Sequence, residues 1–182
     1  SGVDENGEVT TVAVGDEMMV NTYTSGTQEV PSIGSLADGG FVVTWRDNSS
    51  HSNNWDVWAQ QFDANSDAVG GEFRVNSYES SEQREARVTG LEGGGYVITW
   101  HDNSSHSGGS GWDVRAQIYD NNGIAVGSEF RVNEYTSSSQ YYPDVAPLEG
   151  GGFIITWWDD SSHDGGSSYD VYAQRYDADG TA

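Results

Sequence analysis

The chain has 182 residues, with 7 Lys and Arg against 29 Asp and Glu, so its formal net charge at pH 7 is −22. Repulsion at this charge excludes nucleic acids and anionic membranes as partners, and the compact state needs a compensating cation or high salt. The lack of cysteine excludes disulfides, a thiol nucleophile and a Cys-based zinc site, while 7 Trp, 10 Tyr and 5 Phe supply a core and argue against disorder.

The chain opens on a polar stretch, residues 1–11, that is expected to be a linker to other domains of a larger protein. Residues 12–182 are expected to form a single domain. No apolar stretch approaches the roughly 18 residues of a membrane span, so membrane insertion is not expected.

Three repeats fill the domain. The stretches "DEMMVN", "GEFRVN" and "SEFRVN" end at Asn21, Asn76 and Asn133, at intervals of 55 and 57 residues. Trp45, Trp100 and Trp157 follow the same intervals. The repeats are therefore assigned to residues 17–71, 72–128 and 129–182.

Each repeat predicts about four strands and no helix. A strand around "EFRVN" is followed by "PSIGSL", "ARVTGL" or "PDVAPL", then by "GFVVTW", "GYVITW" or "GFIITW", and last by "DVWAQQF", "DVRAQIY" or "DVYAQRY". These runs are rich in β-branched and aromatic residues and are separated by Gly, Asn and Asp. The predicted fold class is all-β, with a pseudo-threefold, propeller-like arrangement of the repeats.

The point in the repeat at which the sequence starts and stops indicates how the two ends of the chain could pair. The chain has "VAVGDEMMVN" near its start and reaches "YDADGTA" where the next such strand would begin. The N-terminal strand is therefore expected to complete the last repeat and close the arrangement. The alternative is a slice of a longer open array in which neighbouring copies pair end to end.

An acidic loop recurs after each "TW", and both of its ends carry Asp in all three copies. Oxygen-rich loops suit calcium, which takes six to eight oxygen ligands, although the spacing does not match the EF-hand pattern. A solvated hairpin loop whose Asp and Ser bond their own backbone is the other reading. The candidate calcium ligands are Asp47, Asp56, Asp102, Asp113, Asp159, Asp160, Asp164 and Asp170.

Enzymatic readings of the same loops are not favoured. His51, His106 and His163 each follow "SS", but a Ser-His-Asp triad is a single constellation, and a motif present three times is more simply a structural loop. Neighbouring Asp159 and Asp160 face opposite sides of a strand and make poor glycosidase partners. The chain is therefore predicted not to be an enzyme.

Aromatic residues that break the repeat pattern mark a candidate ligand site. A repeat protein that binds one ligand must break its own symmetry, and the departures, with the extra carboxylates Asp160 and Asp164, concentrate in the third copy. Neutral variation on the surface is the alternative. The candidate ligand-binding residues are Trp58, Tyr141, Tyr142, Trp158 and Tyr169.

The pattern "LADGGFVVTW…DVWAQQFDANSDAVGGEFRVN" resembles repeats of very large calcium-dependent RTX adhesins of Gram-negative bacteria. Within such adhesins, a domain of similar extent is the calcium-dependent peptide-binding domain, in which a bound calcium helps to grip the C-terminal carboxylate of a host protein. The resemblance implies a secreted protein on the bacterial cell surface, with Ca²⁺ as cofactor and a host cell-surface protein or peptide C-terminus as partner.

The functional expectation is thus a calcium-dependent adhesion module. A carboxylate has little reason to approach a chain of charge −22 unless a cation lies between them. A calcium-dependent lectin that binds cell-surface glycans is the first alternative, because calcium and exposed aromatic rings also suit sugars. A structural spacer repeat without a ligand is the second.

Overall fold

A computed structural model describes residues 2–3, 9–10, 15–49, 54–106, 108, 110–163, 165 and 168–182. Over these residues the protein is all-β, and no helix is long and apolar enough to cross a membrane. The strands in chain order are β1 (Gly2–Val3), β2 (Val9–Thr10), β3 (Gln28–Ser35), β4 (Phe41–Asp47), β5 (Asp56–Phe62), β6 (Ala68–Arg74), β7 (Gln83–Gly90), β8 (Tyr96–Asp102), β9 (Asp113–Tyr119), β10 (Ala125–Arg131), β11 (Gln140–Pro147), β12 (Phe153–Asp159) and β13 (Asp170–Tyr176).

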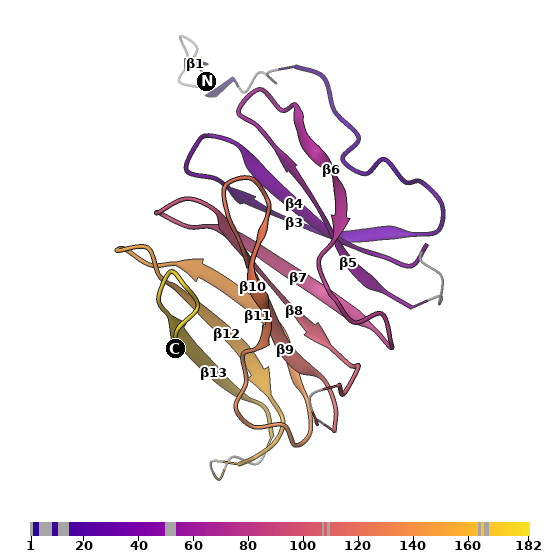
Figure 1. The fold of residues 1–182 in the computed structure, drawn as a ribbon, viewed down its shortest axis with the longest axis vertical. Helices are drawn as coiled ribbons and strands as arrows, with labels where there is room; N and C mark the ends of the chain where they lie inside the picture. Colours follow the sequence, from indigo (N-terminus) through magenta and orange to yellow (C-terminus); the bar gives the residue numbers. More distant parts are fainter. Residues whose placement is uncertain are drawn as a thin grey trace.

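Three antiparallel sheets form the body of the molecule, as Figure 1 shows. Sheet 1 has the order β3-β4-β5-β6, sheet 2 the order β7-β8-β9-β10, and sheet 3 the order β11-β12-β13. The first strand of each sheet lies next to the first strand of the neighbouring sheet, since β7 contacts both β3 and β11. This confirms the predicted all-β, propeller-like arrangement. The short strands β1 and β2 pair with each other inside the segment expected to be a linker.

The core lies between the sheets. One cluster joins Val57 and Ala59 of sheet 1 to Val88 and Ile98 of sheet 2. A second cluster joins sheet 2 to sheet 3, and Val114 of sheet 2 belongs to it. Sheet 2 is covered on both faces, which explains why every residue of β8 and β9 is buried, polar and charged side chains such as His101, Arg115 and Gln117 included.

The structural unit is shifted relative to the sequence repeat. The "EFRVN" strand that opens each sequence repeat is the last strand of the preceding sheet, because β6 pairs with β5 and β10 pairs with β9. Residues after β6 and β10 then cross to the next sheet. The boundaries of the three sheets therefore fall near residues 28–74, 83–131 and 140–176.

An asparagine joins each sheet to the next at these crossings. Asn76 Nδ2 donates to Asp56 Oδ1 of sheet 1 at 2.8 Å and to Gln83 Oε1 of sheet 2 at 3.2 Å, while its Oδ1 accepts the Val57 N–H at 2.8 Å. The asparagine at the second crossing, Asn133, makes the equivalent bonds. The repeated Asn therefore bridges two sheets with its own short side chain.

The structure corrects the expectation that the N-terminal strand completes the last repeat. Residues 15–27 contain no strand, and sheet 3 has three strands in the described part of the chain. Instead, Val20 packs on Val43 and Trp45 of sheet 1, and Glu72 accepts hydrogen bonds from two backbone N–H groups of the N-terminal segment. Figure 1 shows β1 beside sheet 1 and the C-terminus beside sheet 3, so the two do not meet.

Candidate functional site

The two aspartates of each acidic loop face each other at one end of a sheet. The strand register pairs Asp47 with Asp56, Asp102 with Asp113, and Asp159 with Asp170. All six are candidate ligands from the sequence, and all except Asp170 are buried. Two carboxylates so close together and out of water repel each other unless hydrogen bonds or a cation compensate them.

Much of this compensation comes from the protein itself. The first aspartate of each loop caps its own turn: Asp159 Oδ1, for instance, accepts the Ser161 N–H at 2.7 Å, and Asp47 and Asp102 bond Ser49 and Ser104 in the same way. The second aspartate accepts from the bridging asparagine in sheets 1 and 2. The loops therefore have the self-bonded turn geometry that was the alternative to calcium.

In sheet 2 a guanidinium group supplies a positive charge. Arg115 Nε lies 3.3 Å from Asp102 Oδ2, and Arg115 Nη1 lies 3.5 Å from Glu129 Oε1. His106 Nε2 is 3.5 Å from the same Glu129 oxygen. Among the described residues, Asp102, His106 and Glu129 are the one set of three whose ligating atoms lie within 4.8 Å of one another.

This set could hold a cation only in competition with Arg115. Asp102 Oδ2 and His106 Nε2 are buried atoms without a hydrogen-bond partner, as a metal site would require. The Arg115 side chain is also buried and already neutralises the two carboxylates. Sheet 1 has Trp58 and sheet 3 has Tyr172 at the equivalent position, so this internal cation belongs to sheet 2 alone.

The third loop has the most uncompensated charge. Asp160 Oδ1 accepts the Ser139 N–H at 2.7 Å, as the equivalent Asn48 Oδ1 accepts the Thr27 N–H at 2.7 Å. Asp170 has no bridging asparagine, because no crossing follows sheet 3 in the described chain. Asp164 lies outside the described residues. Oxygen ligands suit calcium, so the carboxylates of this loop fit the ion in kind and charge.

Four of the five predicted ligand-binding residues form one continuous strip of aromatic rings. The centroid distances are 6.1 Å from Tyr141 to Tyr142, 5.1 Å from Tyr142 to Trp158 and 6.2 Å from Trp158 to Tyr169. Tyr142, Trp158 and Tyr169 are each about half exposed or more. Because these residues come from β11, β12 and the loop between β12 and β13, the strip follows the loop end of sheet 3.

A β-bulge sets the position of Tyr142. The register between β11 and β12 shifts by one residue between Tyr141 and Asp144, and Tyr142 has a φ of 51°. An extra residue in one strand bends the strand and redirects its side chains, so both neighbouring tyrosines reach the same side. The equivalent residues Val30 and Glu85 also have positive φ. The bulge is therefore a property of all three repeats, and only the third one presents two tyrosines there.

His101 anchors the inner end of the strip and was not singled out from the sequence. Its ring contacts Trp112 at 4.6 Å and Tyr142 at 5.7 Å between centroids, and its Nδ1 accepts the Tyr142 N–H at 3.2 Å. Burial, and then the positive charges of Arg84, Arg46 and Arg87, lower the pKa of His101 to about 3. The histidine is therefore neutral near pH 7, which its role as acceptor requires.

The basic residues around His101 make the inner end of the strip less acidic than the chain as a whole. Arg46 is paired with Glu29 at 2.7 Å and with Glu85 at 2.9 Å, and Arg84 with Glu82 at 2.6 Å. Arg84 also lies over the Trp112 ring, 5.8 Å from its centroid. Charges are balanced here within a molecule of net charge −22.

Trp58 does not belong to the strip. It pairs with Trp45 across β4 and β5 and is half-buried against Val43, Trp45 and Phe62. Because directly paired residues share a face of a sheet, Trp58 lies on the face opposite to that of Arg46, whose equivalent in sheet 3 is Trp158. Side chains alternate between the two faces along a strand, and this pattern in the sequence could have shown that Trp58 does not share a face with the other candidates.

Comparison with known proteins adds little about the site. No protein-family model matches the chain, and no curated protein sequence matches it. Among solved structures, the chain is similar to an endo-arabinase from Bacteroides thetaiotaomicron VPI-5482, with 14% identity and a TM-score of 0.49. The match covers 82% of this chain and 57% of the endo-arabinase, so the chain spans little more than half of that protein.

Proposed function

We propose that the protein is a calcium-dependent adhesion module on a bacterial surface, and that the aromatic strip binds the C-terminal end of a peptide from a host protein. The observation that carries this proposal is the strip itself: Tyr141, Tyr142, Trp158 and Tyr169 are contiguous, and three of the four are half exposed or more. Exposed aromatic groups of this extent are characteristic of binding surfaces.

The balanced charges at the inner end of the strip are compatible with a ligand that carries a carboxylate. Arg46 and Arg84 neutralise Glu29, Glu85 and Glu82 there, so an anion meets less repulsion than the net charge of −22 alone implies. The Trp112 ring, over which Arg84 lies, extends the aromatic surface: its centroid is 6.3 Å from that of Tyr141. A peptide end offers both a carboxylate and side chains that pack on rings.

Calcium would be held by the third loop. Asp159 and Asp160, with Asp170 paired to Asp159, are the described residues that would hold it, and Asp164 of the same loop is the further candidate; an ion there would neutralise part of the negative charge at the loop end of sheet 3. Asp160 directly follows β12, the strand that carries Trp158, so the loop and the strip are adjacent in the chain.

Binding of a peptide library to the immobilised protein tests the proposal. The library consists of peptides of random sequence, each made with a free C-terminal carboxylate and with an amide, and is measured in calcium and in EDTA. We expect binding of the free carboxylate forms in calcium only. Trp158→Ala and Tyr142→Ala should each weaken it by about tenfold or more, since an aromatic contact contributes about 1 kcal/mol beyond its buried area. Tyr23→Ala removes an equally exposed ring far from the strip and should change nothing.

The other outcomes identify the alternatives. Equal binding of the amidated peptides would exclude recognition of the carboxylate. Binding to a glycan array, with none to peptides, would instead identify a lectin. Absence of any ligand on both arrays would leave the structural spacer. Full binding in EDTA would remove calcium from the mechanism.

A further inference from the structure

In the part of the chain that the structure describes, sheet 3 has three strands where sheets 1 and 2 have four, and its edge strand β13 shows the consequence. Val57 and Val114, which occupy the same place in β5 and β9, are fully buried, whereas Val171 in β13 is 76% exposed. The outer face of sheet 3, at the place that sheets 1 and 2 bury, is therefore covered by no described part of the chain.

The opposite end of the stack has the complementary face uncovered in part, beside the area on which Val20 packs. Val88 of sheet 2 packs against sheet 1, and its counterpart in sheet 1, Ile33, is 65% exposed. The faces at Val171 and at Ile33 correspond to the two sides of the interface that the molecule itself forms twice, between sheets 1 and 2 and between sheets 2 and 3.

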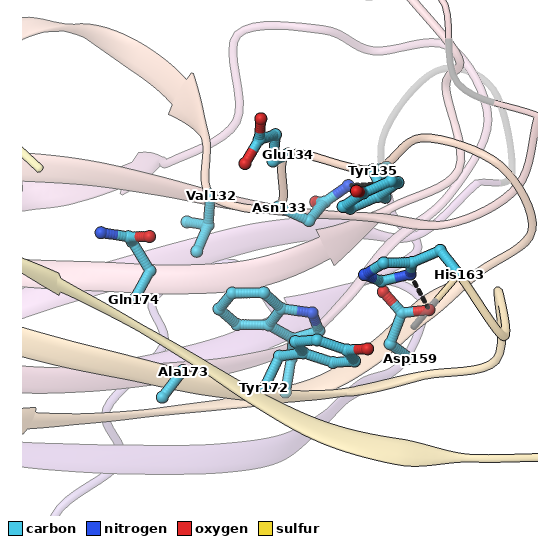
Figure 2. Close-up of a pocket in the computed structure, with 10 residues that line it drawn as sticks. Val132, Asn133, Glu134, Tyr135, Asp159, His163, Tyr172, Ala173 and Gln174 are labelled. Atoms are coloured by element: carbon cyan, nitrogen blue, oxygen red, sulfur yellow. Dashed lines mark hydrogen bonds and ion pairs between the residues drawn. The ribbon is translucent and has the colours of Figure 1, made fainter. Parts of the chain in front are cut away.

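A pocket of about 210 Å³ marks where a side chain of the missing strand would lie. Figure 2 shows Tyr135 lying over His163, with Tyr172 and Asp159 close by. In sheet 2 the equivalent space is occupied by Glu129 of β10, whose Oε2 accepts the Ser77 N–H at 2.8 Å and whose Oε1 approaches His106. The residue equivalent to Ser77 is Glu134, whose side chain lines the pocket of sheet 3.

The chain carries a segment that matches this edge. Residues 16–21, "DEMMVN", correspond to residues 71–76 and 128–133, so Glu17 is the counterpart of Glu72 and Glu129. Val75 and Val132 donate their N–H groups to Val57 O and Val114 O, each at 2.8 Å. By the same correspondence, the Val20 N–H would donate to Val171 O.

Asn21 and Asp170 are complementary in the same way. Asn76 and Asn133 bond Asp56 and Asp113, whereas Asn21 Nδ2 donates to Tyr23 O at 2.9 Å. Asp170 is the aspartate without such a donor. Val20 already packs on sheet 1 as Val132 packs on sheet 3, so the segment would need no new position on its own sheet.

We infer that the protein associates head to tail with a second copy of itself. Residues 16–21 of one copy lie along β13 of the other as its fourth strand, Glu17 enters the pocket beside His163, and the Ile33 face stacks on the Val171 face. Because the two faces differ, the contact is heterologous, and it can extend into a filament. The second copy is the occupant that the structure favours, because it supplies the strand, the glutamate, the asparagine and the apolar face at once.

Two variants test the inference together. Val171→Lys and Ile33→Lys change residues that are exposed in the single chain, so both should fold, and unfolding curves check this. Mass is measured by analytical ultracentrifugation over a wide concentration range in ~0.5 M NaCl, which screens the repulsion between chains of charge −22. Ile124→Lys changes a residue that is 64% exposed but lies on neither open face, and serves as control.

The expected pattern is specific. The wild type and the control should exceed the single-chain mass of 19.7 kDa increasingly with concentration. Each face variant alone should stay at that mass. A mixture of the two should form dimers and nothing larger, because Val171→Lys keeps an intact Ile33 face and Ile33→Lys keeps an intact Val171 face.

The inference would be overturned by a wild type that remains a single chain at every concentration, or by a mixture that does not form dimers. Association that both face variants retain would also overturn it, because another surface would then be responsible. Trp158 lies on the same face of sheet 3 as Val171, its partner in the register, so peptide binding is measured below the concentration at which association begins.

Discussion

Asn133 Nδ2 lies 2.7 Å from Asp113 Oδ1, and this contact joins the end of sheet 2 to the crossing that leads into sheet 3. The same amide reaches Gln140 Oε1 at 3.0 Å, and Asn133 Oδ1 accepts the Val114 N–H at 2.7 Å. One buried side chain therefore satisfies a carboxylate, a backbone donor and a glutamine that belong to two sheets. Such a bridge explains why an asparagine stands at both crossings, since Asn76 makes the same contacts between sheets 1 and 2.

The first prediction concerns this bridge. Asn133→Ala should lower the free energy of unfolding by about 2 to 3 kcal/mol, because it leaves the buried Asp113 carboxylate and the Val114 N–H without their partner. Asn21→Ala is the matched control. The Asn21 amide donates to Tyr23 O and spans no second sheet, so its loss should be below about 1 kcal/mol. Urea unfolding measures both, and equal losses would contradict the bridging role.

The second prediction concerns the internal cation of sheet 2. Arg115→Met should destabilise the protein by about 3 kcal/mol in EDTA, because the Asp102 and Glu129 carboxylates would then be buried without a neutralising charge. With Arg115 gone, Asp102, His106 and Glu129 should hold calcium, so the ion should raise the unfolding midpoint of the variant more than that of the wild type.

Arg74→Met is the control for that experiment. Arg74 pairs with the exposed Glu79 at 2.7 Å and its Nε donates to Asn76 O at 3.0 Å, so its loss should cost about 1 to 2 kcal/mol but leave no buried carboxylate without a partner. A loss no larger for Arg115→Met than for Arg74→Met would show that the guanidinium does not balance the two carboxylates.

The third prediction concerns pH. The pKa of His101 is lowered from 6.5 to about 3 by burial and by neighbouring arginines. The unfolded chain takes up a proton below pH 6.5 that the folded protein does not, so stability is fully present above pH 6.5 and falls as the pH drops towards 3. The contribution of one such group is at most about 1.4 kcal/mol per pH unit.

His101→Gln isolates this contribution. Glutamine can accept the Tyr142 N–H but does not titrate, so the difference in unfolding free energy between wild type and variant should shrink as the pH falls from 6.5 to 4.5. Chemical unfolding at a series of pH values measures the difference. A constant difference would mean that His101 takes up its proton in the folded state as readily as in the unfolded one.

The repeat pattern predicts much of the fold, because strand runs such as "GFVVTW" and turn residues repeat at fixed intervals and β-branched alternation is a local property. The angle between neighbouring sheets is not local. It depends on how Val57 and Val88 pack, and it decides whether the ends meet. The sequence therefore indicates that residues 12–21 match a missing strand but not whether they can reach it.

The candidate site divides in the same way. Tyr141, Tyr142, Trp158 and Tyr169 could be grouped from the sequence because they break the repeat in one copy, and the structure brings them together. His101 and Arg115 were not foreseen as site residues, since each acts across a sheet or between sheets. The pairing of Arg115 with Asp102 needs the register of β8 with β9 and a rotamer, and neither is visible in a residue pattern.

The last prediction concerns calcium at the third loop. The unfolding midpoint should rise with calcium concentration and not with magnesium, because an ion that binds only the folded state stabilises it. Asp160→Asn restores the residue type of Asn48 and Asn103 and can still accept the Ser139 N–H through Oδ1. The variant should therefore fold as well as the wild type in EDTA but respond less to calcium. A tenfold weaker affinity corresponds to about 1.4 kcal/mol at saturating ion.

Asp67→Asn is the control, because it removes the same charge from an exposed turn of the first repeat. It distinguishes the loss of a calcium ligand from a general reduction of the repulsion between carboxylates. It should leave the response to calcium unchanged. If both variants weakened the response equally, calcium would be acting on the net charge of −22 rather than at a site. If neither ion raised the midpoint, the self-bonded turns of Asp47, Asp102 and Asp159 would be sufficient without a metal. If calcium and magnesium raised it alike, the site would not select calcium. Either result would remove the case for a ligand held by calcium.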